Sequence, residues 1–185
     1  MRLLVILVIC ITVLNGGTLE KYMKQLETLD YSQQDVLINA YKAGEPYGYG
    51  LILAVIAWKE SYFGKWPINL SDGKYGSYGV YHIRLDYAMA RKKITSAWDR
   101  SRYAEELLYD FDSSSLEAIG LISHWMNYYK KDKDRVKKVF ASYNGGYKLS
   151  AQALSYADDC LLRMEAIRQY DIHKKYNLIA SNDEY

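Results

Sequence analysis

The pattern of apolar and polar positions is that of a mainly helical protein. Apolar residues recur with the 3.6-residue period of an α-helix along most of the chain, whereas strand-like alternation extends over only a few residues near Val80. Ser32 with Asp35, and Ser114 with Glu117, have the spacing of capping signals at two helix starts. Helices are predicted at residues 32–44, 49–62, 86–95, 97–110, 114–131, 134–143 and 150–175.

One predicted helix is apolar on all sides. In LILAVIAWKES, residues 51–61, eight apolar residues precede Lys59, Glu60 and Ser61, which predicts a helix buried on most of its faces. A carboxyl group at its C-terminal end meets the negative end of the helix dipole and a partly desolvated setting beside Trp58, and both favour the protonated acid. Glu60 is therefore a candidate proton donor. The alternative is that Glu60 only marks the point where the helix reaches water.

Two further segments carry candidate residues. The loop SDGKYGSYGVYHI, residues 71–83, follows the Glu60 helix, and its glycines permit close approaches between the backbone and a ligand. The segment ASYNGG, residues 141–146, ends a later helix, and there Asn144 has the position of a C-capping residue. Taken singly, the first is an ordinary surface loop and the second an ordinary helix stop.

Length, composition and charge allow one globular domain and disfavour several functions. The chain has 185 residues, of which 50% are apolar and 25% charged, and its net charge is +2. A charge so near neutrality gives no support to nucleic-acid binding, which needs a basic face. The histidines, His82, His124 and His173, lack metal-ligand spacing, and no phosphate-binding loop motif is present, so neither a metal nor another cofactor is expected. Cys160 has the pattern of a small core residue.

The N-terminus has the pattern of a targeting segment. Arg2 precedes an apolar run at residues 3–14, and Asn-Gly-Gly follows at 15–17. Such a run is short for a bilayer core about 30 Å thick, which favours a signal peptide over a membrane anchor and predicts export to the periplasm or cell envelope. The expected organisation is a signal peptide or anchor at 1–17, one domain at 18–176 and a flexible acidic tail at 177–185.

Taken together and in this order, the motifs resemble those of the soluble-type lytic transglycosylases, a branch of the lysozyme-like superfamily. Glu60-Ser61 is similar to the family's Glu-Ser pair, and Gly-Val-Tyr-His-Ile at 79–83 stands where the family has Gly-Leu-Met-Gln-Leu or close variants. Residues 141–146 resemble its Ala-Tyr-Asn-Ala-Gly segment, with one extra residue. The resemblance covers about residues 47–168.

The chain departs from the family pattern at two positions. His82 replaces the usual Gln, and Cys160 stands where a Tyr is expected, three residues before Arg163. Tyr156, one helical turn earlier, is the candidate substitute for that Tyr. These departures bear on activity and substrate preference rather than on the fold.

The resemblance implies a monomeric lysozyme-like helical domain with a short β or irregular region after the catalytic helix, and peptidoglycan as its substrate. Catalytic Glu60 would protonate the bond between N-acetylmuramic acid and N-acetylglucosamine. It would then act as base on the 6-hydroxyl of the muramic acid, which leaves a 1,6-anhydro end. The residues implied to bind substrate are Ser61, Gly79, Tyr81, His82, Tyr143, Asn144 and Tyr156.

Two alternatives stay open. Goose-type lysozymes have a similar arrangement with added Asp residues that position a hydrolytic water, and Asp72 and Asp86 lie roughly where these would be needed. Asp72 before Gly73 is also ordinary turn chemistry, and Asp86 has the position of an N-cap. A non-catalytic glycan-binding or structural protein of an envelope or virion is the other alternative, since His82 and Cys160 depart from the pattern.

Overall fold

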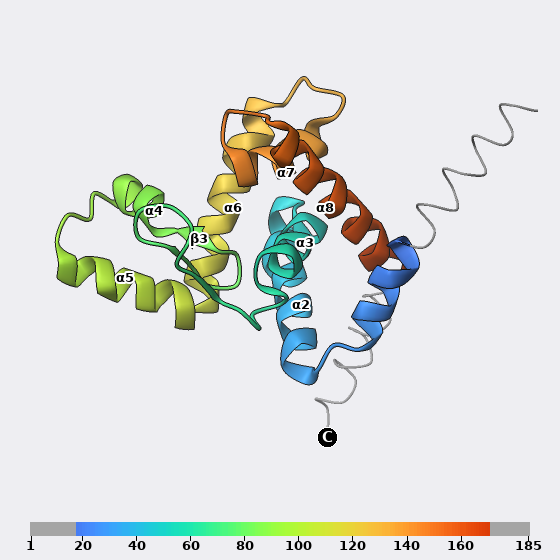
Figure 1. The fold of residues 1–185 in the computed structure, drawn as a ribbon, viewed down its shortest axis with the longest axis horizontal. Helices are drawn as coiled ribbons and strands as arrows, with labels where there is room; N and C mark the ends of the chain where they lie inside the picture. Colours follow the sequence, from blue (N-terminus) through green and yellow to red (C-terminus); the bar gives the residue numbers. More distant parts are fainter. Residues whose placement is uncertain (1–17, 171–185) are drawn as a thin grey trace, which may run out of the picture.

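The computed structural model describes residues 18–170, and over this range the protein is mainly helical, as the hydrophobic pattern predicts (Figure 1). The interpretation of residues 1–17 as a leader, the end of the predicted domain at 176 and the acidic tail lie outside the described residues. None of the helices within 18–170 combines the length and apolar character needed to cross a bilayer.

Each predicted stretch contains a helix, although two helices have a different capping residue from the one predicted. Asp30, rather than Ser32, caps α2 and forms a capping box with Gln33. Asp110 caps α6, where the side chain of Asp110 accepts the amide hydrogen of Ser113. Asp and Ser are both strong N-caps, so spacing alone did not separate them. The first described helix covers residues 18–27. It is followed by α2 (Tyr31–Gly44), η1 (Glu45–Tyr47), α3 (Gly50–Ser61), α4 (Leu85–Lys92), α5 (Ala97–Tyr109), α6 (Phe111–Tyr128), α7 (Arg135–Gly145) and α8 (Ala151–Gln169).

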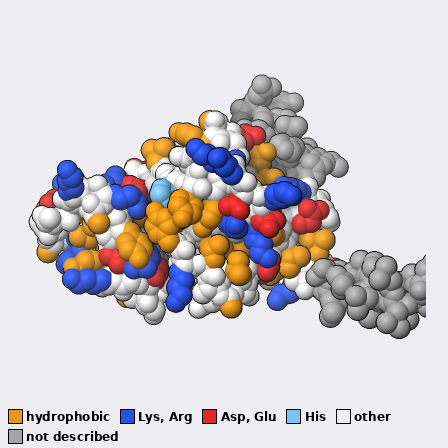
Figure 2. All heavy atoms as spheres, turned by 90° about the horizontal axis from the view of Figure 1, so that it is seen from above, with side chains coloured by type: hydrophobic (Ala, Val, Ile, Leu, Met, Phe, Trp, Pro, Cys, Tyr) orange, Lys and Arg blue, Asp and Glu red, His pale blue; other side chains and the backbone are white. Residues whose placement is uncertain are grey.

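Helix α3 lies at the centre of the packing. Every residue from Ile52 to Trp58 is buried, and α3 contacts α2, α6 and α8 (Figure 1). Helices α4 and α5 form a lobe on one side with the β region, while α7 and α8 lie on the other. On the face shown in Figure 2, basic and acidic side chains are interspersed. The prediction that α3 is buried on most of its faces is confirmed.

A small antiparallel sheet follows α3, as expected for this region. Its strands β1 (Ile68–Asn69), β2 (Ser77–Tyr78) and β3 (Ile83–Arg84) pair in that order, with Ile68 opposite Tyr78 and Ser77 opposite Arg84. The strands are too short for sequence alternation to reveal them.

The turn after α3 is fixed by an unusual backbone. Tyr62, Phe63 and Gly64 all have positive φ, at 53°, 57° and 80°, where a non-glycine residue costs about 1–2 kcal/mol. Burial of Phe63, whose ring stacks on Trp58 at 5.6 Å between centroids, offsets this cost. Buried Ser61 ties the turn to the sheet, because its hydroxyl accepts from the Gly64 amide at 2.7 Å and lies 2.7 Å from the Val80 carbonyl oxygen.

An ionic cluster joins α3 and α8 to the N-terminal helix. Asp159 of α8 accepts from Lys59 Nζ at 2.7 Å, from Arg163 Nε at 2.9 Å and from the Tyr22 hydroxyl. Partial burial raises the pKa of Asp159, but these hydrogen bonds and the charge of Arg163 outweigh it and lower the pKa to about 2. The Arg163 guanidinium lies 4.7 Å from the centre of the Trp58 ring. Lys59 is thereby held by Asp159.

We predict that Asp159→Asn lowers the free energy of unfolding by about 2 kcal/mol at neutral pH. Because the folded-state pKa lies below the ordinary value, the stabilisation is complete above about pH 4 and disappears as the pH falls through about 2. Urea unfolding of both proteins at neutral pH and near pH 2 measures this.

The matched control is Asp158→Asn, which removes a more exposed carboxylate, 2.6 Å from Lys137. It should cost less than about 1 kcal/mol. Equal losses in the two variants would contradict the stabilising role of the Asp159 cluster.

Candidate active site

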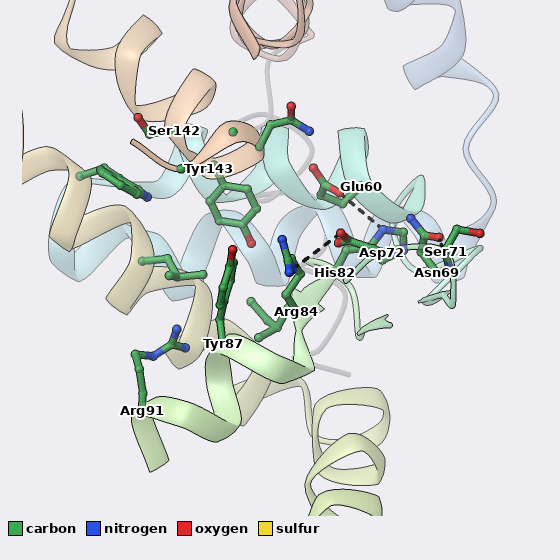
Figure 3. A pocket seen from close by; sticks show the side chains of 16 residues that line it. Glu60, Asn69, Ser71, Asp72, His82, Arg84, Tyr87, Arg91, Ser142 and Tyr143 are labelled. Atoms are coloured by element: carbon green, nitrogen blue, oxygen red, sulfur yellow. Dashed lines mark hydrogen bonds and ion pairs between the residues drawn. The ribbon is translucent and has the colours of Figure 1, made fainter. Parts of the chain in front are cut away.

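A cleft of about 390 Å³ opens between the β region and the ends of α3, α6 and α7 (Figure 3). Its wall carries amide, hydroxyl, aromatic and charged side chains from these elements and from α4. Of the residues predicted from the sequence to form the site, those that line it are Glu60, Asp72, His82, Tyr143 and Asn144.

Glu60 lies in the last turn of α3, and its side chain is 18% exposed. Its Oε1 accepts a hydrogen bond from the hydroxyl of Tyr156 on α8, and its Oε2 lies 3.4 Å from Nδ1 of His82 (Figure 3). Lys59, its neighbour, points away to Asp159. Each carboxyl oxygen of Glu60 therefore has a polar partner while the group still faces the cleft.

His82 reaches Glu60 from the tight connection between β2 and β3. Its backbone has φ of 46°, and its Nε2 lies 2.8 Å from the carbonyl oxygen of Trp66. Burial disfavours the imidazolium, but hydrogen bonding to Glu60 and to the Trp66 carbonyl, with the charges of Glu60 and Asp72, outweighs it and raises the pKa of His82. His82 thus places a titratable group against Glu60.

Two tyrosines surround Glu60 from α7 and α8. Burial, and then the charge of Glu60, raises the pKa of both Tyr143 and Tyr156 well above the ordinary value, so each hydroxyl keeps its hydrogen. Tyr156 donates to Glu60, and Tyr143 donates to the Tyr81 carbonyl oxygen at 2.8 Å. Cys160 is fully buried one turn from Tyr156, as its core-like pattern predicts.

Asn144 does not cap its helix. Helix α7 ends at Gly145, and its C-cap is Gly146, with φ of 64°. Asn144 is exposed and lines the cleft. The structure therefore favours the cleft position over the capping alternative.

Ser61, Gly79 and Tyr81 are buried and are not among the residues that line the cleft, so the substrate-binding role that the resemblance implies for them stays a prediction. Ser61 is hydrogen-bonded within the turn after α3. Tyr81 places its hydroxyl 2.9 Å from Oγ of Ser115 on α6. These residues support the wall of the cleft from behind.

Arg84 holds both candidate water-positioning carboxylates. Its Nη2 lies 2.7 Å from Asp86 Oδ2, and its Nε lies 3.7 Å from Asp72 Oδ1. Asp86 is not among the residues that line the cleft, and its water-positioning role stays a prediction. It is not the N-cap either: α4 has Arg84 at that position, and Asp86 in its first turn accepts from the Tyr87 amide at 3.0 Å.

Sequence reasoning missed several lining residues. Arg84, Tyr87 and Arg91 enter the cleft from β3 and α4, and Trp125 enters from α6. The first three have the i, i+3, i+7 spacing of one helical face, which is a weak signal that could have found them. Trp125 belongs to no motif.

Within residues 18–170, no group of His, Cys, Asp and Glu side chains has the arrangement of a metal site. Comparison with known proteins found no matching family model, curated protein or solved structure.

We predict that Gly79→Ala destabilises the fold. A Cβ at Gly79 would lie 2.2 Å from the Leu107 carbonyl oxygen and 2.7 Å from Ser114 Oγ, at a φ of +81°. The loss should exceed about 3 kcal/mol, from the left-handed backbone and the steric clash together. Thermal or urea unfolding measures it.

Gly48→Ala is the control, because Gly48 has φ of +73° but, apart from its chain neighbours, no atom lies within 4 Å of the place that a Cβ would take. It isolates the backbone cost of about 1–2 kcal/mol. Losses of the same size in both variants would contradict close packing at Gly79.

Proposed function

We propose that the protein is a lytic transglycosylase that cleaves peptidoglycan glycan strands between N-acetylmuramic acid and N-acetylglucosamine, with Glu60 as its catalytic acid and base. The observation that carries this proposal is the setting of Glu60. A carboxyl group at the end of a buried helix faces a cleft and has a hydroxyl and an imidazole on its two oxygens. The resemblance of the motifs around Glu60, His82 and Asn144 supports the choice of substrate.

In the first step, protonated Glu60 donates its proton to the oxygen that joins the two sugars. Breaking this bond leaves positive charge on the muramic acid ring, in an oxocarbenium-like state. Glu60 is then a carboxylate beside that charge. The hydrogen bond from Tyr156 to Oε1 stabilises the anion, because this hydroxyl keeps its hydrogen.

In the second step, the Glu60 carboxylate accepts the proton of the sugar's own 6-hydroxyl as that oxygen bonds to the ring carbon. The product has a 1,6-anhydro ring, and the proton that Glu60 gave is restored. Attack within one sugar needs no second reactant to be bound, so proximity supplies much of the rate advantage.

One carboxyl group suffices for this chemistry, and the cleft favours such a mechanism. Among its described lining residues, the second carboxylate is Asp72, which lies against Arg84. A two-carboxylate glycosidase needs its second group free to act as base or nucleophile. The amide of Asn144 and the rings of Tyr143 and Trp125 offer the hydrogen-bonding and apolar surfaces that sugars require.

The goose-type hydrolase is kept as a second candidate because Asp72 does line the same cleft as Glu60. Release of Asp72 from Arg84, 3.7 Å away, would allow it to position a water. For both candidates we propose a monomeric enzyme that is exported to its wall substrate or delivered with a virion.

We predict that Glu60→Gln reduces release of fragments from purified murein sacculi by at least about 100-fold, because the amide neither donates nor accepts the transferred proton. Circular dichroism and unfolding should show that the fold is retained. Glu105→Gln, on the exposed side of α5, is the matched control and should cleave normally. Cleavage by Glu60→Gln at the wild-type rate would refute both enzymatic candidates, and glycan binding without cleavage by the wild type would favour a binding protein.

We predict that mass spectrometry of the soluble products shows 1,6-anhydro-muramic ends, and that Asp72→Asn changes the rate by less than about threefold, since an exposed ion pair contributes little. Ends heavier by one water, together with loss of activity in Asp72→Asn, would instead establish the hydrolase. The control is Asp86→Asn, which removes the other carboxylate at Arg84 from outside the cleft.

A further inference from the structure

The imidazole of His82 lies between two oxygen atoms with different hydrogen-bonding abilities. One is a carbonyl oxygen, which can only accept, and the other belongs to a carboxyl group, which accepts when ionised and can donate when protonated. Its Nε2 is 2.8 Å from the Trp66 carbonyl oxygen, and its Nδ1 is 3.4 Å from Glu60 Oε2. A carbonyl oxygen only accepts, so Nε2 carries a hydrogen in this contact. In the neutral imidazole, Nδ1 is then the acceptor, and it faces the carboxyl group of Glu60.

The contact between Nδ1 and Oε2 is attractive only with one proton between them. Without a proton, two lone pairs would face each other, and with two protons, two hydrogens would. One proton gives either a carboxylic acid beside neutral imidazole or a carboxylate beside imidazolium. In both forms Tyr156 donates to Oε1 of Glu60, so the other carboxyl oxygen already has its partner.

The charged groups near the sheet favour retention of this proton. Burial of the ring lowers the pKa of His82, but the contacts with Glu60 and the Trp66 carbonyl, together with the charges of Glu60 and Asp72, outweigh it and raise the pKa. Arg84, the nearby cation, has Asp86 at 2.7 Å and Asp72 at 3.7 Å. Its charge is therefore offset by two carboxylates next to the pair.

The groups that approach from α3, α7 and α8 do not compete for the proton near neutral pH. Burial raises the pKa of Tyr143, Tyr156 and Cys160, so all three keep their hydrogens. Lys59 is bonded to Asp159 at 2.7 Å, and its charge is matched there. The pair of Glu60 and His82 is left as the unit that gains or loses a proton.

We propose that Glu60 and His82 share one proton and act as a unit in which His82 keeps Glu60 able to protonate the glycosidic oxygen. The catalytic consequence rests on the proposed function, whereas the shared proton is a property of the pair itself. When the proton lies on Nδ1, its transfer to Oε2 regenerates the carboxylic acid and a neutral imidazole. The acid then donates to the leaving sugar, and the proton of the 6-hydroxyl returns to the pair, which ends with the one proton it began with.

His82 acts through Glu60 and is therefore a positioning residue, whose effect should appear as a dependence on pH. With His82 present, the active form is lost only when the pair gives up its shared proton. Without it, Glu60 alone must hold the proton, with no imidazole beside Oε2 to keep it in the site. His82 thus extends activity toward neutral pH.

The first test needs no substrate. Imidazole titration by NMR should give His82 a pKa above the ordinary value of about 6.5, and Glu60→Gln should lower it by about one unit or more. His124, on α6 beside Tyr147, is an internal reference whose titration should not change. An unchanged His82 titration in Glu60→Gln would overturn the shared proton.

The second test follows kcat/KM for sacculi from about pH 4 to 8. In His82→Gln the alkaline limb should move to lower pH by about one unit or more, while activity at the acid end stays within about tenfold of wild type. His124→Gln should keep the wild-type profile. A uniform loss at every pH, with the limb unmoved, would assign His82 a merely structural role. If Glu60→Gln still cleaves, the proposed function fails, and the NMR titration still decides the pairing.

Discussion

Burial of α3 on nearly all sides is the constraint on which the rest of the structure depends. Because Ile52 to Trp58 are packed against α2, α6 and α8, the polar end of the helix can emerge in only one place. At that end Lys59 turns to Asp159, whereas Glu60 faces the cleft. The hydrophobic effect therefore positions the carboxyl group, and hydrogen bonds only complete its orientation.

The turn after α3 transmits that position to the β region. Positive φ at three successive residues is tolerated because Phe63 is buried and Ser61 binds both the turn and the Val80 carbonyl. The tight connection between β2 and β3 brings His82 to the cleft. Gly79, which has no side chain, lets this connection approach α5 and α6 closely. Residues buried behind the cleft thus fix the geometry between Glu60 and His82.

The sequence was sufficient to predict helices α2 to α8, the burial of α3 and the position of the candidate carboxyl group, because these depend on periodicity and on local position, but it did not predict the helix at residues 18–27. It was insufficient for contacts that depend on the packing of distant segments. Nothing local shows that Tyr81 points into the core while Tyr143, with similar neighbours, lines the cleft. The pairing of Arg84 with Asp72 and Asp86 is likewise visible only after the sheet has formed.

Tyr156 and Cys160 lie one helical turn apart on α8 but have different surroundings. Positions four residues apart on a helix share a face, so a hydroxyl can reach the same carboxyl group from either position if the side chain is long enough. Once Tyr156 supplies that hydroxyl, position 160 has no polar partner to satisfy, and a small thiol can fill the core there. One face of α8 thus carries both the hydroxyl that binds Glu60 and, one turn later, a thiol that packs in the core.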